Sequence, residues 1–307
     1  MATQTLPYEH LGKALATDYF FVREQFSDEE WTQFIATRRF VDNEVLPAIN
    51  EYWERAELPW PLMRRLPELG LIGDDVQGHG CPGMSPLARG LVNMELHRGD
   101  GSLGTFHAVQ SGLAMKAIDM LGSDAQKEEW LAPMARLDKI GGFALTEPEH
   151  GSDSVALESG ARREGDEWVL DGTKRWIGNG SIADVVVVWA RSSEDGQVKG
   201  FLVRTDTPGF AAATMEGKGA SRAIWQAEIT LDGVRVPDAD RLPGGRTFKD
   251  AARVLVTTRV TCAWAALGHA VAAYDVALTY SKERRQFGKP LCAFQIVQDK
   301  LRRCSPT

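Results

Sequence analysis

The spacing of apolar residues changes twice along this chain, and these changes restrict the fold more than any other feature. In the first part, apolar residues such as Trp31, Phe34 and Ile35 recur at helical intervals. From about residue 140, short β-branched or aromatic runs such as ADVVVVWA and KGFLVRT alternate with turn residues, which is typical of strands. Residues 247–283 then form one long pattern rich in Ala, Val and Leu, which is apolar nearly all round, as in a buried bundle helix, but the sequence supplies few partners to cover such a helix.

We therefore expect an α+β chain of several domains, because 307 residues exceed one ordinary core. The expected order is an N-terminal helical domain at 20–139, a middle antiparallel β-sandwich or barrel domain at 140–243, and an incomplete C-terminal helical bundle domain at 244–307. No stretch of the middle domain is long enough for a crossover helix, so a parallel sheet of βαβ units is not expected. Turns between its strands are expected at three Asp-Gly pairs: Asp171-Gly172, Asp195-Gly196 and Asp232-Gly233.

Local signals place helix starts and a loop within the N-terminal domain. Ser85 precedes a helical pattern as an N-cap, and Ser123 with Gln126 forms a capping-box pattern. The segment GHGCPG at 78–83 matches the dinucleotide-binding spacing G-x-G-x-x-G. The residues before it look helical rather than strand-like, and Pro82 lacks an amide that a phosphate cradle needs. We therefore predict a loop between two helices.

Composition argues against several classes of function. The 42 acidic against 35 basic residues give a net charge of −7, which disfavours a nucleic-acid partner, and no polybasic run suits a membrane surface. The N-terminus has no signal-peptide pattern, and the longest charge-free apolar stretch, Val260–Tyr274, is shorter than the roughly 18 residues of a membrane span. We expect a cytoplasmic protein without a metal site, because the four cysteines are scattered without ligand spacing: Cys81, Cys262, Cys292 and Cys304.

The loop GGFALTEPEHGSD at 141–153 lies between the helical and the strand-like parts. Gly, Pro, Ser and Asp are ordinary turn formers, so these residues alone leave a plain inter-domain turn open beside a ligand-binding loop. Glu147 and His150 are candidates for acid–base chemistry. The sequence shows no second catalytic group at a spacing typical of acid–base pairs, and we interpret both residues as part of the loop structure.

Three stretches in this order resemble the acyl-CoA dehydrogenase family, including its glutaryl-CoA and short-chain oxidase-like branches. They are FALTEPEHGSD, GTKRWIGNGSIADVVVVWAR and YSKERRQFGKPLCAFQIVQDKL, and the resemblance extends from about residue 20 to residue 301. It implies a flavoprotein with FAD that catalyses α,β-dehydrogenation of an acyl-CoA thioester in lipid metabolism. It also implies a homo-oligomer, a dimer or tetramer, with an electron-transfer flavoprotein or oxygen as the electron acceptor.

In this family the first stretch bends over the flavin. By resemblance, the residues that hold the ring and the pyrophosphate or CoA region are Phe143, Leu145, Thr146, Gly151 and Ser152. The Thr146 hydroxyl and nearby amides would bond the ring edge, because reduction places negative charge there and fixed dipoles stabilise that charge.

The second stretch resembles the strand that faces the flavin, with Trp176, Ile177 and Gly178 at the matching positions. Trp176 would pack its indole against the ring system, and the alternative is an ordinary tryptophan of the sandwich core. Many family members carry a threonine where this chain has Gly178, so here only the backbone amide is available to the flavin.

The third stretch matches positions that reach the FAD of a neighbouring subunit, at Arg284, Phe287 and Gln295. An arginine suits a pyrophosphate because its planar fork forms bidentate, charge-assisted bonds. These positions are the basis for the expected oligomer. The neighbouring Lys282 and Arg285 are not assigned a role.

The resemblance places substrate contacts at Ser152, Gly104, Thr105, Thr258 and Arg259. Arg259 is the only charge in the apolar segment VLVTTRVTCAWAALG, where an unpaired buried arginine would be expensive, which favours a functional interpretation. Glutaryl-CoA enzymes place an arginine at the position of Gly104 to bind the distal carboxylate. We therefore expect a neutral acyl group of short or medium length.

The resemblance implies a catalytic carboxylate at one of two positions, and neither is filled here. The commoner position lies beyond residue 307, and the second is occupied by Thr258. We therefore predict no catalytic residue in this chain, which departs from the family pattern after QDKL as a truncation or frameshift would. The alternative function is an inactive product that binds acyl-CoA or FAD weakly or not at all.

Overall fold

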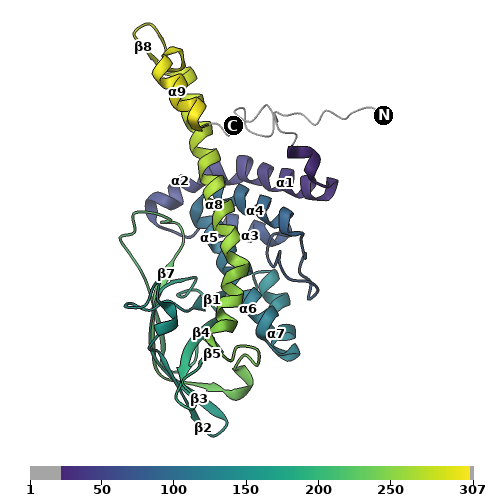
Figure 1. The fold of residues 1–307 in the computed structure, drawn as a ribbon, viewed down its shortest axis with the longest axis vertical. Helices are drawn as coiled ribbons and strands as arrows, with labels where there is room; N and C mark the ends of the chain where they lie inside the picture. The colour runs from purple at the N-terminus through teal and green to yellow at the C-terminus, as the bar shows by residue number, and fades with distance from the viewer. Residues whose placement is uncertain (1–21, 305–307) are drawn as a thin grey trace.

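The computed structural model describes residues 22–304, and its elements follow the α–β–α order expected from the sequence (Figure 1). The N-terminal helices are α1 (Asp28–Phe40), α2 (Leu46–Arg55), α3 (Trp60–Glu68), α4 (Pro86–Gly99), α5 (Gly101–His107), α6 (Lys116–Leu121) and α7 (Asp124–Ala135). Short π-helical segments at Val41–Val45 and Ala108–Met115 join α1 to α2 and α5 to α6.

The helix starts lie where the capping signals place them. The Ser85 hydroxyl accepts from the Ala88 amide at 3.1 Å and begins α4, while Ser123 and Gln126 form both bonds of a capping box at α7. These bonds satisfy amides that have no partner within the helix. The segment 78–83 is a loop between α3 and α4, as predicted.

The middle part is a seven-stranded sheet of β1 (Gly141–Ala144), β2 (Gly160–Glu164), β3 (Glu167–Gly178), β4 (Val185–Ser192), β5 (Val198–Arg204), β6 (Phe210–Thr214) and β7 (Gln226–Pro237). The order is β1-β4-β2-β3-β7-β6, and β5 also pairs with β4. Most pairs are antiparallel, but β4 pairs in parallel with β1 and β2. The expected antiparallel β domain is confirmed apart from these two parallel pairings, which turn signals do not predict because such signals concern only strands that are consecutive in the chain.

Only one of the three Asp-Gly pairs is a turn between strands. Asp195-Gly196 joins β4 to β5. Asp171-Gly172 lies inside β3, at a shift of register against β7 where Gly172 has a φ of 144°, and Asp232-Gly233 lies inside β7. The Asp171 carboxylate accepts from the Gly233 amide at 2.8 Å. These two signals therefore mark a β-bulge and its partner strand rather than two chain reversals.

The C-terminal part begins with α8 (Phe248–Glu283), which crosses the N-terminal helices beside α4. Its far end projects beyond them together with β8 (Arg285–Gln286), β9 (Lys289–Pro290) and α9 (Gln295–Cys304) (Figure 1).

Two glycines let α4 and α8 approach closely. A Cβ atom at Gly90 of α4 would lie 2.2 Å from the Trp264 ring, and a Cβ atom at Gly268 of α8 would lie 2.2 Å from the Met94 carbonyl oxygen. The contact is therefore too close for a methyl group at either position, as expected for densely packed interiors.

The long apolar helix expected at 247–283 is confirmed, and within the described residues it is only partly covered, as expected for a bundle helix to which the sequence supplies few partners. Few of its residues are buried, whereas large apolar side chains stay exposed at Val256, Val260, Leu267, Val276 and Tyr280. The apolar pattern indicates a helix that can pack on several sides, but it does not show whether partners are present. By length and composition, α8 is also the one helix in residues 22–304 that could cross a membrane, a test that core helices of water-soluble proteins pass as well.

Candidate functional site

The loop that follows β1 is held against β3 by three hydrogen bonds. The Arg175 amide donates to the Thr146 carbonyl at 2.9 Å. The buried Lys174 ammonium donates to the Leu145 carbonyl at 3.3 Å and to the Glu147 carboxylate at 2.8 Å. The half-buried Thr146 hydroxyl has no hydrogen-bond partner in the part of the chain that the structure describes. This hydroxyl is therefore available to a ligand.

Glu147 is an anchor of the loop rather than an acid–base group. Its carboxylate accepts from the amides of Glu158 at 2.6 Å and Ser159 at 2.9 Å, in addition to Lys174. Burial raises the pKa of this carboxyl, but the hydrogen bonds from these groups outweigh burial and lower the pKa to about 2. His150 lies 3.3 Å from the exposed Glu158 carboxylate. Both residues act as loop structure, in line with our interpretation of the sequence.

Trp176 lies at an irregular point of β3. The register against β7 shifts between Lys174 and Ile177, and Trp176 has a φ of 62°, a left-handed conformation that is unusual for a bulky residue. Trp176 is 55% exposed, while Ile177 stays buried. The alternative of a sandwich-core tryptophan is thereby excluded. Backbone strain of this kind, at an exposed aromatic ring beside an anchored loop, is typical of ligand contacts.

The neighbours of Trp176 restrict which groups can meet a ligand. Phe143 packs against Trp189 with ring centroids 6.0 Å apart, and Phe143 and Leu145 are both buried. Any ligand contact from these two residues would therefore come from the backbone. A Cβ atom at Gly178 would lie 2.7 Å from the Val109 Cγ2 atom. Val109 thus occupies the space of the threonine side chain that the resemblance would place there.

Gly151 and Ser152 are exposed at the tip of the loop. A Cβ atom at Gly151 would have no neighbour within 4 Å. The space where a Gly151 side chain would lie is therefore empty of other protein atoms.

Gly104 and Thr105 lie in α5, where Gly104 is buried against His97 of α4. A Cβ atom at Gly104 would lie 2.4 Å from the His97 ring, so His97 fills the side-chain space. The His97 Nδ1 atom lies 3.4 Å from Nε2 of His269 on α8. Burial lowers the pKa of His97 to about 4, with a further contribution from His269, so this imidazole is neutral at neutral pH.

Thr258 and Arg259 differ in their surroundings. Thr258 borders a cavity of about 20 Å³ between α4, the 108–115 segment and α8, and its hydroxyl donates to the Leu255 carbonyl at 3.0 Å. Arg259 is exposed and forms no ion pair with residues 22–304. The expectation of a buried arginine in an apolar helix is wrong, because this face of α8 is open.

The residues predicted to reach a neighbouring subunit lie apart from Thr146 and Trp176. Arg284, Phe287 and Gln295 are all exposed in the end of the chain that projects beyond the helices (Figure 1), and Phe287 is 92% exposed. The fold of this chain does not bring them to the loop.

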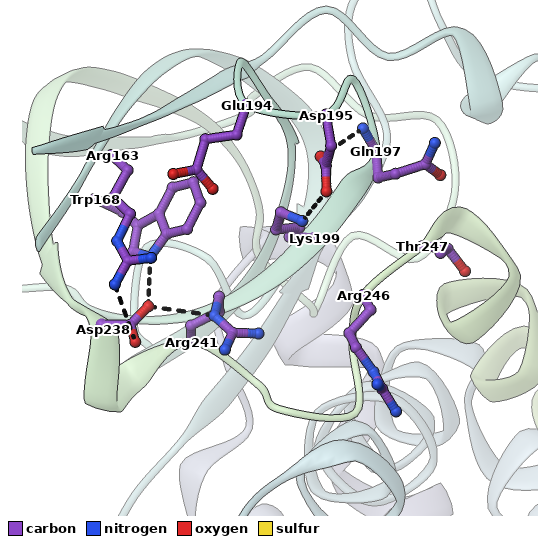
Figure 2. A pocket seen from close by; sticks show the side chains of 10 residues that line it. All are labelled: Arg163, Trp168, Glu194, Asp195, Gln197, Lys199, Asp238, Arg241, Arg246 and Thr247. Atoms are coloured by element: carbon purple, nitrogen blue, oxygen red, sulfur yellow. Dashed lines mark hydrogen bonds and ion pairs between the residues drawn. The ribbon is translucent and has the colours of Figure 1, made fainter. Parts of the chain in front are cut away.

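A cavity of about 370 Å³ lies between the β2–β3 hairpin and the segment that leads into α8 (Figure 2). Its charged side chains are largely paired with one another. Asp238 accepts from the Trp168 indole at 2.7 Å and from Arg241 at 3.3 Å, and Asp195 accepts from Lys199 at 2.6 Å. None of the predicted site residues lines this cavity, which is therefore not the candidate site.

Sequence reasoning missed Lys174 and His97. A signal for Lys174 existed, because Trp168 and Leu170 of the same strand are buried and alternation places residue 174 on that face. No signal existed for the contact between His97 and Gly104, which depends on how two helices pack. Residues 22–304 contain no group of three or more His, Cys, Asp or Glu side chains that could hold a metal ion.

Trp176→Ala is expected to change the free energy of unfolding by less than about 1 kcal/mol, because surface substitutions are usually mild. Trp189→Ala, at a fully buried ring, is the matched control and should cost about 3–5 kcal/mol. Urea unfolding followed by circular dichroism measures both variants. A loss at Trp176 as large as that at Trp189 would show that its ring packs in a core.

The descriptions of the N-terminal, middle and C-terminal domains of acyl-CoA dehydrogenase match residues 28–138, 142–234 and 245–305. The short-chain specific acyl-CoA dehydrogenase, mitochondrial, of Bos taurus is 38% identical over 270 residues, which cover 86% of this chain but only 65% of that protein. A glutaryl-CoA dehydrogenase from Mycobacterium smegmatis, solved in complex with FADH2, superimposes with a TM-score of 0.90 at 38% identity, covering 92% of this chain and 73% of that one. Butyryl-CoA dehydrogenase from Megasphaera elsdenii gives a TM-score of 0.85 at 31% identity, covering 91% and 75%. The chain belongs to the acyl-CoA dehydrogenase family.

Proposed function

We propose that the protein is an FAD-dependent oxidoreductase that removes hydrogen from Cα and Cβ of an acyl-CoA thioester. The observation that carries this proposal is the exposed Trp176 ring, which directly follows the residue whose amide is bonded to the Thr146 carbonyl of an anchored loop. A flat ring system such as a flavin suits an indole face, and its polar edge needs hydrogen-bond donors. The FADH2 in the similar Mycobacterium smegmatis enzyme supports the same cofactor.

When bound, the flavin supplies the acceptor for the β-hydrogen, which leaves as a hydride. The residues of this chain would hold and orient it. Trp176 would pack against the ring, the Thr146 hydroxyl would donate to the ring edge, and Gly151 with Ser152 would contact the pyrophosphate or CoA region. Backbone groups would come from Phe143, Leu145, Ile177 and Gly178.

Removal of the α-proton needs a carboxylate, and we assign none to this chain. At the second of the two positions implied by the family stands Thr258, whose hydroxyl is engaged with the Leu255 carbonyl. A threonine hydroxyl is a poor base at neutral pH without an adjacent activating group. The chain spans 65% of the Bos taurus relative, so the activity is proposed for the whole protein.

The proposed substrate carries a neutral acyl group of short or medium length. At Gly104 and Thr105, where the acyl group would end, the space for a longer side chain is filled by His97. His97 is neutral at neutral pH and offers no positive charge to a distal carboxylate. Arg259 would contact the thioester end from the open face of α8.

For the electron acceptor we propose an electron-transfer flavoprotein or oxygen, because the quoted motifs are common to both groups of enzymes. In a dimer or tetramer, Arg284, Phe287 and Gln295 would bind the FAD of a neighbouring copy, and their exposure on the projecting end supports this. A cytoplasmic location remains a prediction, and the Bos taurus relative is described as mitochondrial.

Titration with FAD tests the proposed cofactor. The purified protein, freed of bound nucleotide, should take up FAD and turn yellow, and Trp176→Ala should weaken uptake by about tenfold or more, as the loss of about 1.4 kcal/mol of ring contact predicts. Folded protein that stays colourless with excess FAD would contradict the proposal.

The substrate proposal makes a separate prediction. Butyryl-CoA and octanoyl-CoA should bind the FAD-loaded protein at least about tenfold more tightly than glutaryl-CoA, because a buried carboxylate without a partner costs more than about 1–3 kcal/mol. Isothermal titration calorimetry measures the three affinities. The control is Gly104→Arg combined with His97→Ala, which frees the space and adds the missing charge and should bring glutaryl-CoA closer to the others. A wild-type preference for glutaryl-CoA would show that the acyl site has been misplaced.

A further inference from the structure

Lys174 and Glu147 form an ion pair that is almost completely buried beneath the loop. Their side chains are 0% and 5% exposed, and the Nζ–Oε1 distance is 2.8 Å. Buried ion pairs of this kind are often no more stabilising than apolar side chains of the same volume. In some proteins such buried groups instead fix one arrangement of the segments that they join.

The pair fixes the backbone on both sides of Thr146. The Lys174 ammonium donates to the Leu145 carbonyl before Thr146 and to the Glu147 carboxylate after it. The Thr146 carbonyl itself accepts from the Arg175 amide. Three consecutive loop residues are thus bonded to two consecutive residues of β3.

The same lysine begins the irregular stretch of β3 that turns Trp176 outward. After the shift at Gly172, the register against β7 is regular from Gly172 to Lys174 and resumes at Ile177. Because Lys174 is held inward by Glu147 and Ile177 is held inward by the core, the extra residue is left at Trp176, which adopts the left-handed conformation. The buried Lys174 ammonium therefore influences the position of both groups proposed to contact the flavin, the Thr146 hydroxyl and the Trp176 ring.

We propose that Lys174 and Glu147 are positioning residues of the cofactor site, which hold the Thr146 hydroxyl and the Trp176 ring in the spacing that receives a flat heteroaromatic ring. This inference rests on the proposed function. The pair itself does not touch the ligand, since both side chains lie beneath the loop.

The charges of the pair support this role. Burial lowers the pKa of Lys174 to about 8, and the bond and charge of Glu147 act in the opposite direction, so the ammonium is mostly protonated at neutral pH. Glu147 is ionised there, with its pKa lowered to about 2. Both hydrogen bonds of the ammonium are therefore charge-assisted, which makes them stronger than bonds between neutral groups.

The decisive variant is Lys174→Met combined with Glu147→Gln. It replaces the ion pair by neutral side chains of similar size, and the introduced glutamine would keep an oxygen for one of the two amides, those of Glu158 and Ser159, that the carboxylate accepts from. Apolar or neutral replacements of a buried pair usually preserve folding. The control is Lys139→Met, which removes a lysine from a pair with Asp184 of the same 2.8 Å length but with a 47% exposed side chain.

Three measurements are made on each protein: the thermal midpoint without FAD, the dissociation constant for FAD, and the visible spectrum of the bound flavin. The double variant should keep the thermal midpoint of the wild type but bind FAD at least about tenfold more weakly, with a shifted flavin spectrum, whereas Lys139→Met should match the wild type in all three. Equal FAD affinity and an unchanged spectrum in the folded double variant would overturn the positioning role. So would unfolding of the double variant, which would give the pair a structural role. Wild-type protein that takes up no FAD would instead overturn the proposed function.

Discussion

Glutamine in place of Glu95 is expected to lower the free energy of unfolding by about 3–5 kcal/mol, the typical loss when one partner of a buried ion pair is removed. Glu95 of α4 is fully buried between two guanidinium groups. Its Oε2 atom lies 3.3 Å from Nε of Arg38 and 2.7 Å from Nε of Arg98. The variant would leave both arginines buried, with Asp42 as an ion-pair partner of Arg98 alone.

Equilibrium unfolding in urea measures this loss. The control is Glu44→Gln, which removes the partner of Arg65 at 2.9 Å in a pair whose side chains are both 38% exposed, and it should cost less than about 1 kcal/mol. If the two variants were equally stable, the network around Glu95 would have to be open to water, contrary to its burial.

The order of the elements could be predicted from the sequence because local signals determine it. Ser85 and Ser123 begin helices through bonds that span only three residues. The Asp-Gly signals were less specific, because the same dipeptide suits a turn at Asp195 and a bulge at Asp232. The partial exposure of α8 agrees with the small number of partner segments in the sequence, since an apolar face shows only that a helix can be covered.

The candidate site could be predicted in part. The family resemblance assigned Thr146 and Trp176 to one site. In the structure the amide of Arg175, the residue before Trp176, donates a hydrogen bond to the Thr146 carbonyl. What the sequence could not show is the bulge that exposes Trp176 and the buried partner of Lys174, because both arise between segments distant in the chain. The sequence also could not show that the His97 ring fills the space beside Gly104, because these two residues lie on different helices.

Gly268→Ala should destabilise the contact between α8 and α4, by about 1–3 kcal/mol or more. In an exposed helix the same change stabilises by up to about 1 kcal/mol, because glycine is a poor helix former. Here the new methyl group would lie 2.2 Å from the Met94 carbonyl oxygen, and a backbone atom cannot rotate away as a side chain can. The whole of α8 would have to move outward, and the Trp264 ring would leave its close contact with Gly90.

Gly112→Ala is the matched control for this change. Its new methyl group would lie 3.7 Å from the Thr258 Cγ2 atom, an ordinary contact distance, so the variant should be neutral or more stable by up to about 1 kcal/mol. Urea unfolding gives the two free energies, and amide hydrogen exchange along α8 shows where protection is lost. If Gly268→Ala matched Gly112→Ala in both measurements, α8 would not lie against α4 as closely as the structure places it. The opposite signs expected for the two glycine-to-alanine changes follow from the neighbouring atoms, which are a backbone carbonyl oxygen at Gly268 and a methyl group at an ordinary contact distance at Gly112.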